Sequence, residues 1–211
     1  MKIDMEDILK KLSEERPIFD SEDDFKFSLC WKIKETYKGA EIGLEVPIII
    51  DKSPDPIYLD ILVIYEDKWI PIELKYKTKP IKYNSPDFIL DTFDLTHQQA
   101  YNKSCYNYLK DIERIEDIKK KYDTFKEGYA IFLINDLHYT RGPGKTAHYY
   151  EFSLKDSITK EGTLKYQKEP ADYEPIKLSD SYPIEWKKYS KLDIDAKNNK
   201  FVYNIAKIQN E

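Results

Sequence analysis

The sequence YLDILVIYEDKWIPIELKYK, residues 58–77, decides the fold because it contains two strands and the turn between them. Branched and aromatic residues dominate both sides of the polar residues 66–68, and runs of this kind predict β-strands. The connection is short enough for a hairpin, so we expect antiparallel neighbours at about 57–66 and 69–77. A similar run predicts a preceding strand at about 42–50.

Three charged residues interrupt the apolar pattern of this hairpin. Asp60 lies in an apolar strand, where an unpaired carboxylate is costly. Glu73 and Lys75 are two residues apart, so they share one face of the next strand while Ile72 and Leu74 face the other way. The 12 residues between Asp60 and Glu73 suit two acids side by side on neighbouring strands. A cross-strand ion pair on an exposed sheet face is the alternative interpretation.

Two crowded carboxylates favour a divalent metal ion between them. Magnesium fits best, because it prefers oxygen ligands, whereas zinc needs His or Cys that this stretch lacks. We expect Asp60, Glu73 and the Leu74 carbonyl as ligands, with manganese able to substitute. A metal ion held there can activate water and neutralise a scissile phosphate. Lys75 is expected to orient the attacking water or to stabilise the transition state.

Asp60 followed by Glu73-Leu74-Lys75, in the order helix, strand, hairpin, helix, strand, resembles the PD-(D/E)xK nuclease superfamily. This group includes restriction endonucleases and recombination exonucleases. The resemblance covers about residues 20–137, and Leu59 stands where the motif's name has proline. It implies a restriction-endonuclease-like fold of the α/β (α+β) class, with a mixed β-sheet flanked by helices. It also implies a magnesium-dependent nuclease acting on DNA, for example a restriction or defence endonuclease.

The resemblance suggests two further site residues. Members often add an acid from the helix before the first strand, and Glu22 matches it in a helix expected at about 21–38 after the N-cap Ser21. The alternatives are that Glu22 is only an acid of the first helical turn, or that Glu45 completes the site. The family also commonly has Gln on the helix after the motif, which Gln98 matches. Tyr101 follows three residues later instead of four, so the exonuclease signature is broken.

The remaining pattern predicts one domain over residues 1–211, with a core at about 20–140 and a β-rich C-terminal extension at about 147–211. We expect the extension to lengthen the sheet or to pack a small β-layer on it. Beyond the elements named above, the pattern predicts a first helix at 3–12, a long connection at 80–93, a helix at 94–122, a buried strand at 128–137, and strands at 149–154, 162–166 and 201–208.

Composition limits the partners without choosing among them. The formal net charge of −5 argues mildly against bulk binding of a polyanion, although lysines can still gather on one face. The N-terminal residues lack the apolar run of a signal peptide, so we expect a cytoplasmic protein without a membrane partner. DNA is the expected partner, and a homodimer is plausible for double-strand cutting. The competing hypotheses are a catalytically inactive nucleic-acid-binding or assembly module, and a nuclease that acts on RNA.

Overall fold

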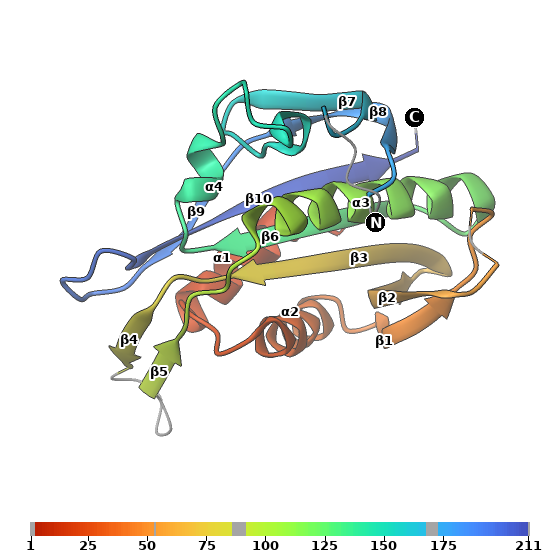
Figure 1. Cartoon of the computed structure of the whole chain (residues 1–211). Helices are drawn as coiled ribbons and strands as arrows, with labels where there is room; N and C mark the ends of the chain where they lie inside the picture. The colour runs from red at the N-terminus through yellow and green to blue at the C-terminus, as the bar shows by residue number, and fades with distance from the viewer. Residues whose placement is uncertain (1–2, 53, 86–91, 168–172, 211) are drawn as a thin grey trace.

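The computed structural model describes residues 3–52, 54–85, 92–167 and 173–210, and shows a mixed α/β architecture around a six-stranded sheet (Figure 1). The strands of this sheet are, in spatial order, β1 (Glu41–Ile48), β2 (Ile57–Tyr65), β3 (Lys68–Lys77), β6 (Glu127–Ile134), β10 (Lys200–Gln209) and β9 (Lys187–Lys191). The helices are α1 (Met5–Glu15), α2 (Glu22–Thr36), α3 (Tyr101–Lys121), α4 (His138–Arg141) and the 3-10 helix η1 (Tyr150–Phe152). Two separate hairpins are formed by β4 (Ile81–Asn84) with β5 (Thr92–Leu95) and by β7 (Ile158–Leu164) with β8 (Ile176–Ile184).

The predicted central hairpin is confirmed. β2 and β3 pair antiparallel from Tyr65↔Lys68 to Ile61↔Ile72. The turn residues Glu66 and Asp67 both have positive φ, +52° and +59°, as a tight two-residue hairpin connection requires. β3 then pairs parallel with β6, which makes the sheet mixed.

Alternation along β3 and β6 divides the core between the two faces of the sheet. Leu74 and Ile131 pack on the face covered by α1 and α2, which also buries Phe25. Phe132 packs on the opposite face with Ile112 of α3. Every residue of β6 is buried, as expected for a parallel strand covered on both sides. The buried strand predicted at 128–137 is confirmed over 128–134, and it ends at Ile134.

Helix α2 begins where the sequence predicts. The Asp24 N–H donates to the Ser21 hydroxyl at 3.1 Å, and three acids in the first turn complement the positive end of the helix. Phe25, Leu29 and Ile33 form its buried face, so the helix predicted at 21–38 is confirmed. In the described parts of the chain, no helix combines the length and apolarity needed to cross a membrane.

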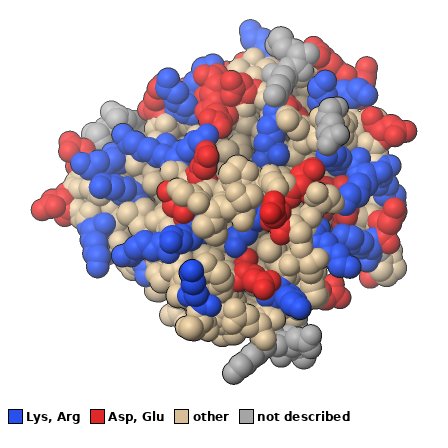
Figure 2. Space-filling model, turned by 90° about the horizontal axis from the view of Figure 1, so that it is seen from above, with Lys and Arg blue, Asp and Glu red and all other residues tan. Residues whose placement is uncertain are grey.

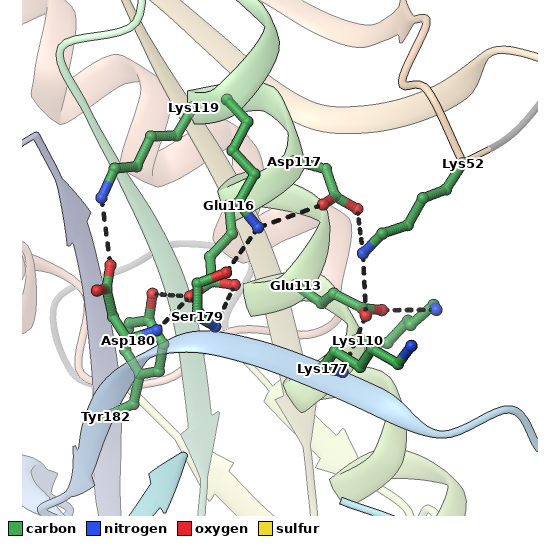
Figure 3. Close-up of polar contacts among 11 residues, drawn as sticks. Lys52, Lys110, Glu113, Glu116, Asp117, Lys119, Lys177, Ser179, Asp180 and Tyr182 are labelled. Carbon is green, nitrogen blue, oxygen red and sulfur yellow. Dashed lines mark hydrogen bonds and ion pairs between the residues drawn. The ribbon is translucent and has the colours of Figure 1, made fainter. Parts of the chain in front are cut away.

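A polar network fastens the β7–β8 hairpin to α3 (Figure 3). The buried Glu116 carboxylate accepts the backbone N–H groups of Ser179 and Asp180 at 2.8–3.0 Å and the Tyr182 hydroxyl at 2.8 Å. One turn earlier, Glu113 accepts the Lys177 N–H at 2.9 Å. Strand N–H groups need hydrogen-bond acceptors, and the carboxylates of α3 supply them to β8 as the carbonyls of a neighbouring strand would. The β-rich extension therefore does both things expected of it: β9 and β10 lengthen the sheet, and this hairpin forms a layer over α3.

The predicted helix at 94–122 starts too early. Residues 92–95 form β5, whose Phe93 and Leu95 are buried in alternation, and α3 begins only at Tyr101. Pairing with β4 satisfies the backbone there, so the helical spacing of Leu95 and Gln98 with later residues is coincidental. The connection at 80–93 is a hairpin over its described residues, and residues 86–91 lie outside them.

The predicted strand at 149–154 is wrong. Its aromatic residues are partly or fully buried, but the segment forms η1 and pairs with none of the strands that the structure describes. The Leu154 carbonyl accepts a hydrogen bond from the Trp186 indole at 2.8 Å instead. The strand predicted at 162–166 lies earlier, at β7, and the polar strands β8 and β9 were not predicted.

The contact of α3 with the sheet depends on a glycine. A Cβ at Gly128 would lie 2.4 Å from Ile115 Cγ2 and 3.2 Å from the Pro71 carbonyl. We expect Gly128→Ala to lower the free energy of unfolding by about 1–3 kcal/mol, because α3 must move off β6. Urea denaturation measures this loss, with Gly144→Ala as the control, since no atom of the described residues lies within 4 Å of that Cβ. Equal losses in both variants would contradict this packing.

Candidate active site

Within the described residues, the C-terminal half of β3 has no strand partner on one side, because its pairing with β2 ends at Ile72. Two acids replace that partner. The Leu74 N–H donates to Asp60 Oδ2 at 2.8 Å, and the Tyr76 N–H donates to Glu22 Oε2 at 2.7 Å. Since strand N–H groups must be satisfied, the backbone of β3 fixes one carboxylate from β2 and one from α2.

Glu73 and Lys75 lie on the α3 side of β3, opposite Leu74, as the alternation predicts. The Glu73 side chain is only 3% exposed. The Lys75 ammonium is 2.8 Å from Asp111 Oδ2 and donates to the Leu74 carbonyl at 2.9 Å. The ion pair with Asp111 brings a residue of α3 into the site.

Asp60 and Glu73 are neighbouring acids whose pKa values shift in opposite directions. Burial raises the pKa of Glu73 well above its ordinary value, and the charges of Asp111 and Asp60 raise it further. Burial alone would raise the pKa of Asp60 too, but the Leu74 N–H, a hydrogen bond with Glu73 and the charge of Lys75 together lower it. The two carboxyl groups therefore lose their protons in different pH ranges, Asp60 below its ordinary range and Glu73 above it.

Asp111 is a buried acid that sequence reasoning missed. Its side chain is 3% exposed, and burial raises its pKa against the opposing charges of Lys75 and Arg114. Arg114 Nη1 lies 3.3 Å from Asp111 Oδ1 and 3.9 Å from Glu73 Oε1. A signal was available, because position 111 falls three residues after the buried Tyr108, on the apolar side of the helix.

Lys26 of α2 is the second missed residue. Its ammonium hydrogen-bonds Glu45 and lies 3.3 Å from both Asp60 Oδ1 and Asp23 Oδ1. Burial alone would lower the pKa of Lys26, but Glu45 and Asp60 outweigh it and raise the pKa. Glu45, the alternative acid, is therefore linked to the site by its hydrogen bond with Lys26. Glu22 is linked to it by the hydrogen bond from the Tyr76 N–H.

Gln98 is the candidate that the structure places elsewhere. It lies in the loop before α3 and not on the helix, and its N–H donates to the Thr78 carbonyl at 3.0 Å. Its buried Oε1 has no hydrogen-bond partner among the described residues. The structure thus brings Asp60, Glu73, Lys75 and Glu22 to one stretch of β3 and leaves Gln98 beyond its end.

The donor set fits magnesium in its chemistry. Asp60, Glu73 and the Leu74 carbonyl offer oxygen ligands, and the buried Glu73 Oε1 has no hydrogen-bond partner within the described chain. Across residues 3–52, 54–85, 92–167 and 173–210, no group of three or more His, Cys, Asp or Glu side chains is arranged to hold a metal ion. The side chains available as ligands are therefore those of Asp60 and Glu73. The Leu74 carbonyl already accepts a hydrogen bond from the Lys75 ammonium.

Comparison with known proteins adds no relative. No family model matches the sequence, and no curated protein or solved structure matches it. The likeness of Asp60, Glu73 and Lys75 to the PD-(D/E)xK motif therefore depends on the sequence of these residues alone.

Replacing Glu73 tests whether burial and the neighbouring acids disfavour its ionised form. Between the ordinary pKa of about 4.5 and its raised folded value, the native state binds more protons than the unfolded chain, so stability falls as pH rises. Glutamine cannot ionise. We therefore expect Glu73→Gln to be more stable than wild type at pH 7.5 in EDTA, with the difference disappearing near pH 4, as measured by urea denaturation.

The matched control is Glu127→Gln on the adjacent strand. Glu127 is equally buried, but Lys207 Nζ lies 2.7 Å from it and the Ile3 N–H donates to it at 3.2 Å. We expect this variant to lose stability at pH 7.5, because it breaks a satisfied buried pair. A loss of similar size in Glu73→Gln would favour the simple cross-strand ion pair.

Proposed function

We propose that this protein is a magnesium-dependent nuclease of the PD-(D/E)xK type that hydrolyses phosphodiester bonds in DNA. The observation that carries the proposal is the placement on and beside β3 of Asp60, fixed by the Leu74 N–H, the buried Glu73 and the Lys75 ammonium. A buried pair of acids with opposed pKa shifts is typical of functional sites. A restriction-endonuclease-like fold, with this sheet and helix order, is part of the same proposal.

Each residue of the site has a distinct role in this proposal. Asp60 and Glu73 would hold the metal ion with the Leu74 carbonyl, and Glu73 would release its proton on binding. Bound magnesium would lower the pKa of a water and offset charge on the phosphate. The Lys75 ammonium would orient that water. Glu22, fixed by the Tyr76 N–H, would place a further carboxylate beside Lys77, 4.0 Å from its ammonium.

The charge of the surface bears on how nucleic acid would be recognised. Seen from above the β7–β8 hairpin, basic and acidic side chains are interspersed (Figure 2). With a net charge of −5, this supports local recognition of a backbone instead of broad attraction to nucleic acid.

The second candidate is an inactive nucleic-acid-binding or assembly module with a nuclease-like sheet. The observation in its favour is that protein cations already contact the acids. Lys26 lies 3.3 Å from Asp60 Oδ1, and Lys75 donates to the Leu74 carbonyl. In such a module these lysines would replace the metal ion permanently. RNA as substrate and a homodimer remain further hypotheses.

Plasmid cleavage tests the nuclease directly. Purified protein with supercoiled plasmid and Mg²⁺ or Mn²⁺ is expected to produce nicked DNA. Glu73→Gln and Lys75→Met should each lower the rate by about 100-fold or more, because one removes a ligand charge and the other a catalytic cation. Glu127→Gln, a buried glutamate away from the site, should cut at the wild-type rate. Equal cutting by all variants would remove the assignment.

Metal binding separates the nuclease from the inactive module. Calorimetric titration with Mn²⁺ is expected to show a binding heat in the wild type and none in Asp60→Asn, since the amide has lost the ligand charge. Asp24→Asn is a control from α2, because Asp24 is paired with Arg16 at 2.8 Å. Wild-type protein that gives no heat would support the inactive module.

A further inference from the structure

Two cations of the site share one buried anchor. Asp111 of α3 contacts Lys75 through Oδ2 at 2.8 Å and Arg114 through Oδ1 at 3.3 Å. Its own side chain is 3% exposed, so it cannot itself reach a ligand in solvent. An ionised buried acid is stable only with such partners, and they are correspondingly fixed in position. Asp111 therefore orders a lysine from β3 and an arginine from α3 on the same face of the sheet.

Arg114 has donors to spare. Its side chain is 36% exposed, and in the described contacts only Nη1 is engaged, with Asp111 and, at 3.9 Å, with Glu73 Oε1. A guanidinium carries five N–H donors in a planar fork. The remaining nitrogens can therefore meet a ligand while Nη1 stays anchored.

The ligand best matched to this arrangement is a phosphate of a nucleic-acid backbone. A planar fork pairs with two phosphate oxygens at once, which an ammonium cannot do. The acids Asp60 and Glu73 would repel an anion, so an anionic backbone needs a fixed cation next to them. Arg114 supplies it on the solvent side of the pair, and Lys75 is on the buried side, at 16% exposure.

We propose that Arg114 binds a backbone phosphate next to the bond that is cut, and that Asp111 is the positioning residue that holds its guanidinium there. This inference rests on the proposed nuclease function and deepens it, because it assigns a substrate contact outside the Asp60, Glu73 and Lys75 motif. The simpler alternative is that Arg114 only neutralises the buried acids.

Binding without metal ions tests the contact apart from catalysis. A fluorescent 20-base-pair DNA duplex is titrated with protein in EDTA, and anisotropy is followed over a series of salt concentrations. Arg114→Ala is expected to weaken binding by about tenfold and to lower the salt dependence by about 0.9, the loss of one phosphate contact. Arg114→Lys should keep the salt dependence but weaken binding, because it retains the charge and loses the fork. A residue that only neutralises the acids would leave the salt slope unchanged.

The positioning role is tested on the same helix. Asp111→Asn should weaken binding less than Arg114→Ala, and in the double variant the two effects should not add, because Asp111 acts through Arg114. Asp117→Asn is the matched control: Asp117 is a buried acid two turns along, paired with Lys52 at 2.9 Å (Figure 3). It should bind DNA as wild type does. Thermal unfolding verifies that each variant is folded.

The outcomes distinguish the two proposals. If wild type nicks plasmid and Arg114→Ala binds DNA with unchanged affinity and salt slope, the phosphate contact is overturned while the nuclease stands. If Asp111→Asn and Arg114→Ala have additive effects, the positioning role is overturned. If wild type neither binds DNA nor nicks plasmid, both proposals fail together.

Discussion

The parallel pairing of β3 with β6 is the constraint on which the site depends. Parallel neighbours need a long crossover connection, and here that crossover includes α3. The helix must pack on one face of the strands it joins, where the small Gly128 lets it approach β6 closely. That face is the one to which Glu73 and Lys75 point. The same topology that closes the core thus brings Asp111 and Arg114 to the motif.

The end of the β2–β3 ladder is the complementary constraint. Beyond the end of the ladder, the N–H groups of Leu74 and Tyr76 need hydrogen-bond acceptors, which another strand could have supplied. Carboxylates satisfy them instead, one from β2 and one from α2. Acids placed this way are fixed by backbone and not by flexible side chains. A strand with an open side can therefore hold side chains in fixed positions at that side. A fixed position is what a reactive group requires.

The sequence was sufficient for the hairpin, for α2 and for the shared face of Glu73 and Lys75, because each follows from a local period or a local cap. It was insufficient for contacts between distant elements. From the local sequence, Lys26 and Asp111 are only charged residues of two helices. The packing of those helices on the sheet places Lys26 next to Asp60 and Asp111 next to Lys75. The prediction that Gln98 lies on a helix was wrong for the opposite reason. Its spacing was typical of a helix, but β5 pairs with β4 and α3 begins only at Tyr101.

Charge balance at the site links its stability to its proposed chemistry. Lys26 is shared with Glu45 and Asp23, so the cations left to offset Asp60, Glu73 and Asp111 are Lys75 and Arg114. In formal charge this group is neutral when Glu73 keeps its proton. Loss of that proton leaves an excess negative charge beneath α3, which burial makes unfavourable. The proposed divalent cation would offset that charge, and the proposed phosphate would bring a negative charge for Arg114 to bind. In the proposed nuclease, the energetic cost of an ionised Glu73 would therefore favour binding of the metal ion, because the positive charge offsets the carboxylate in the same buried space.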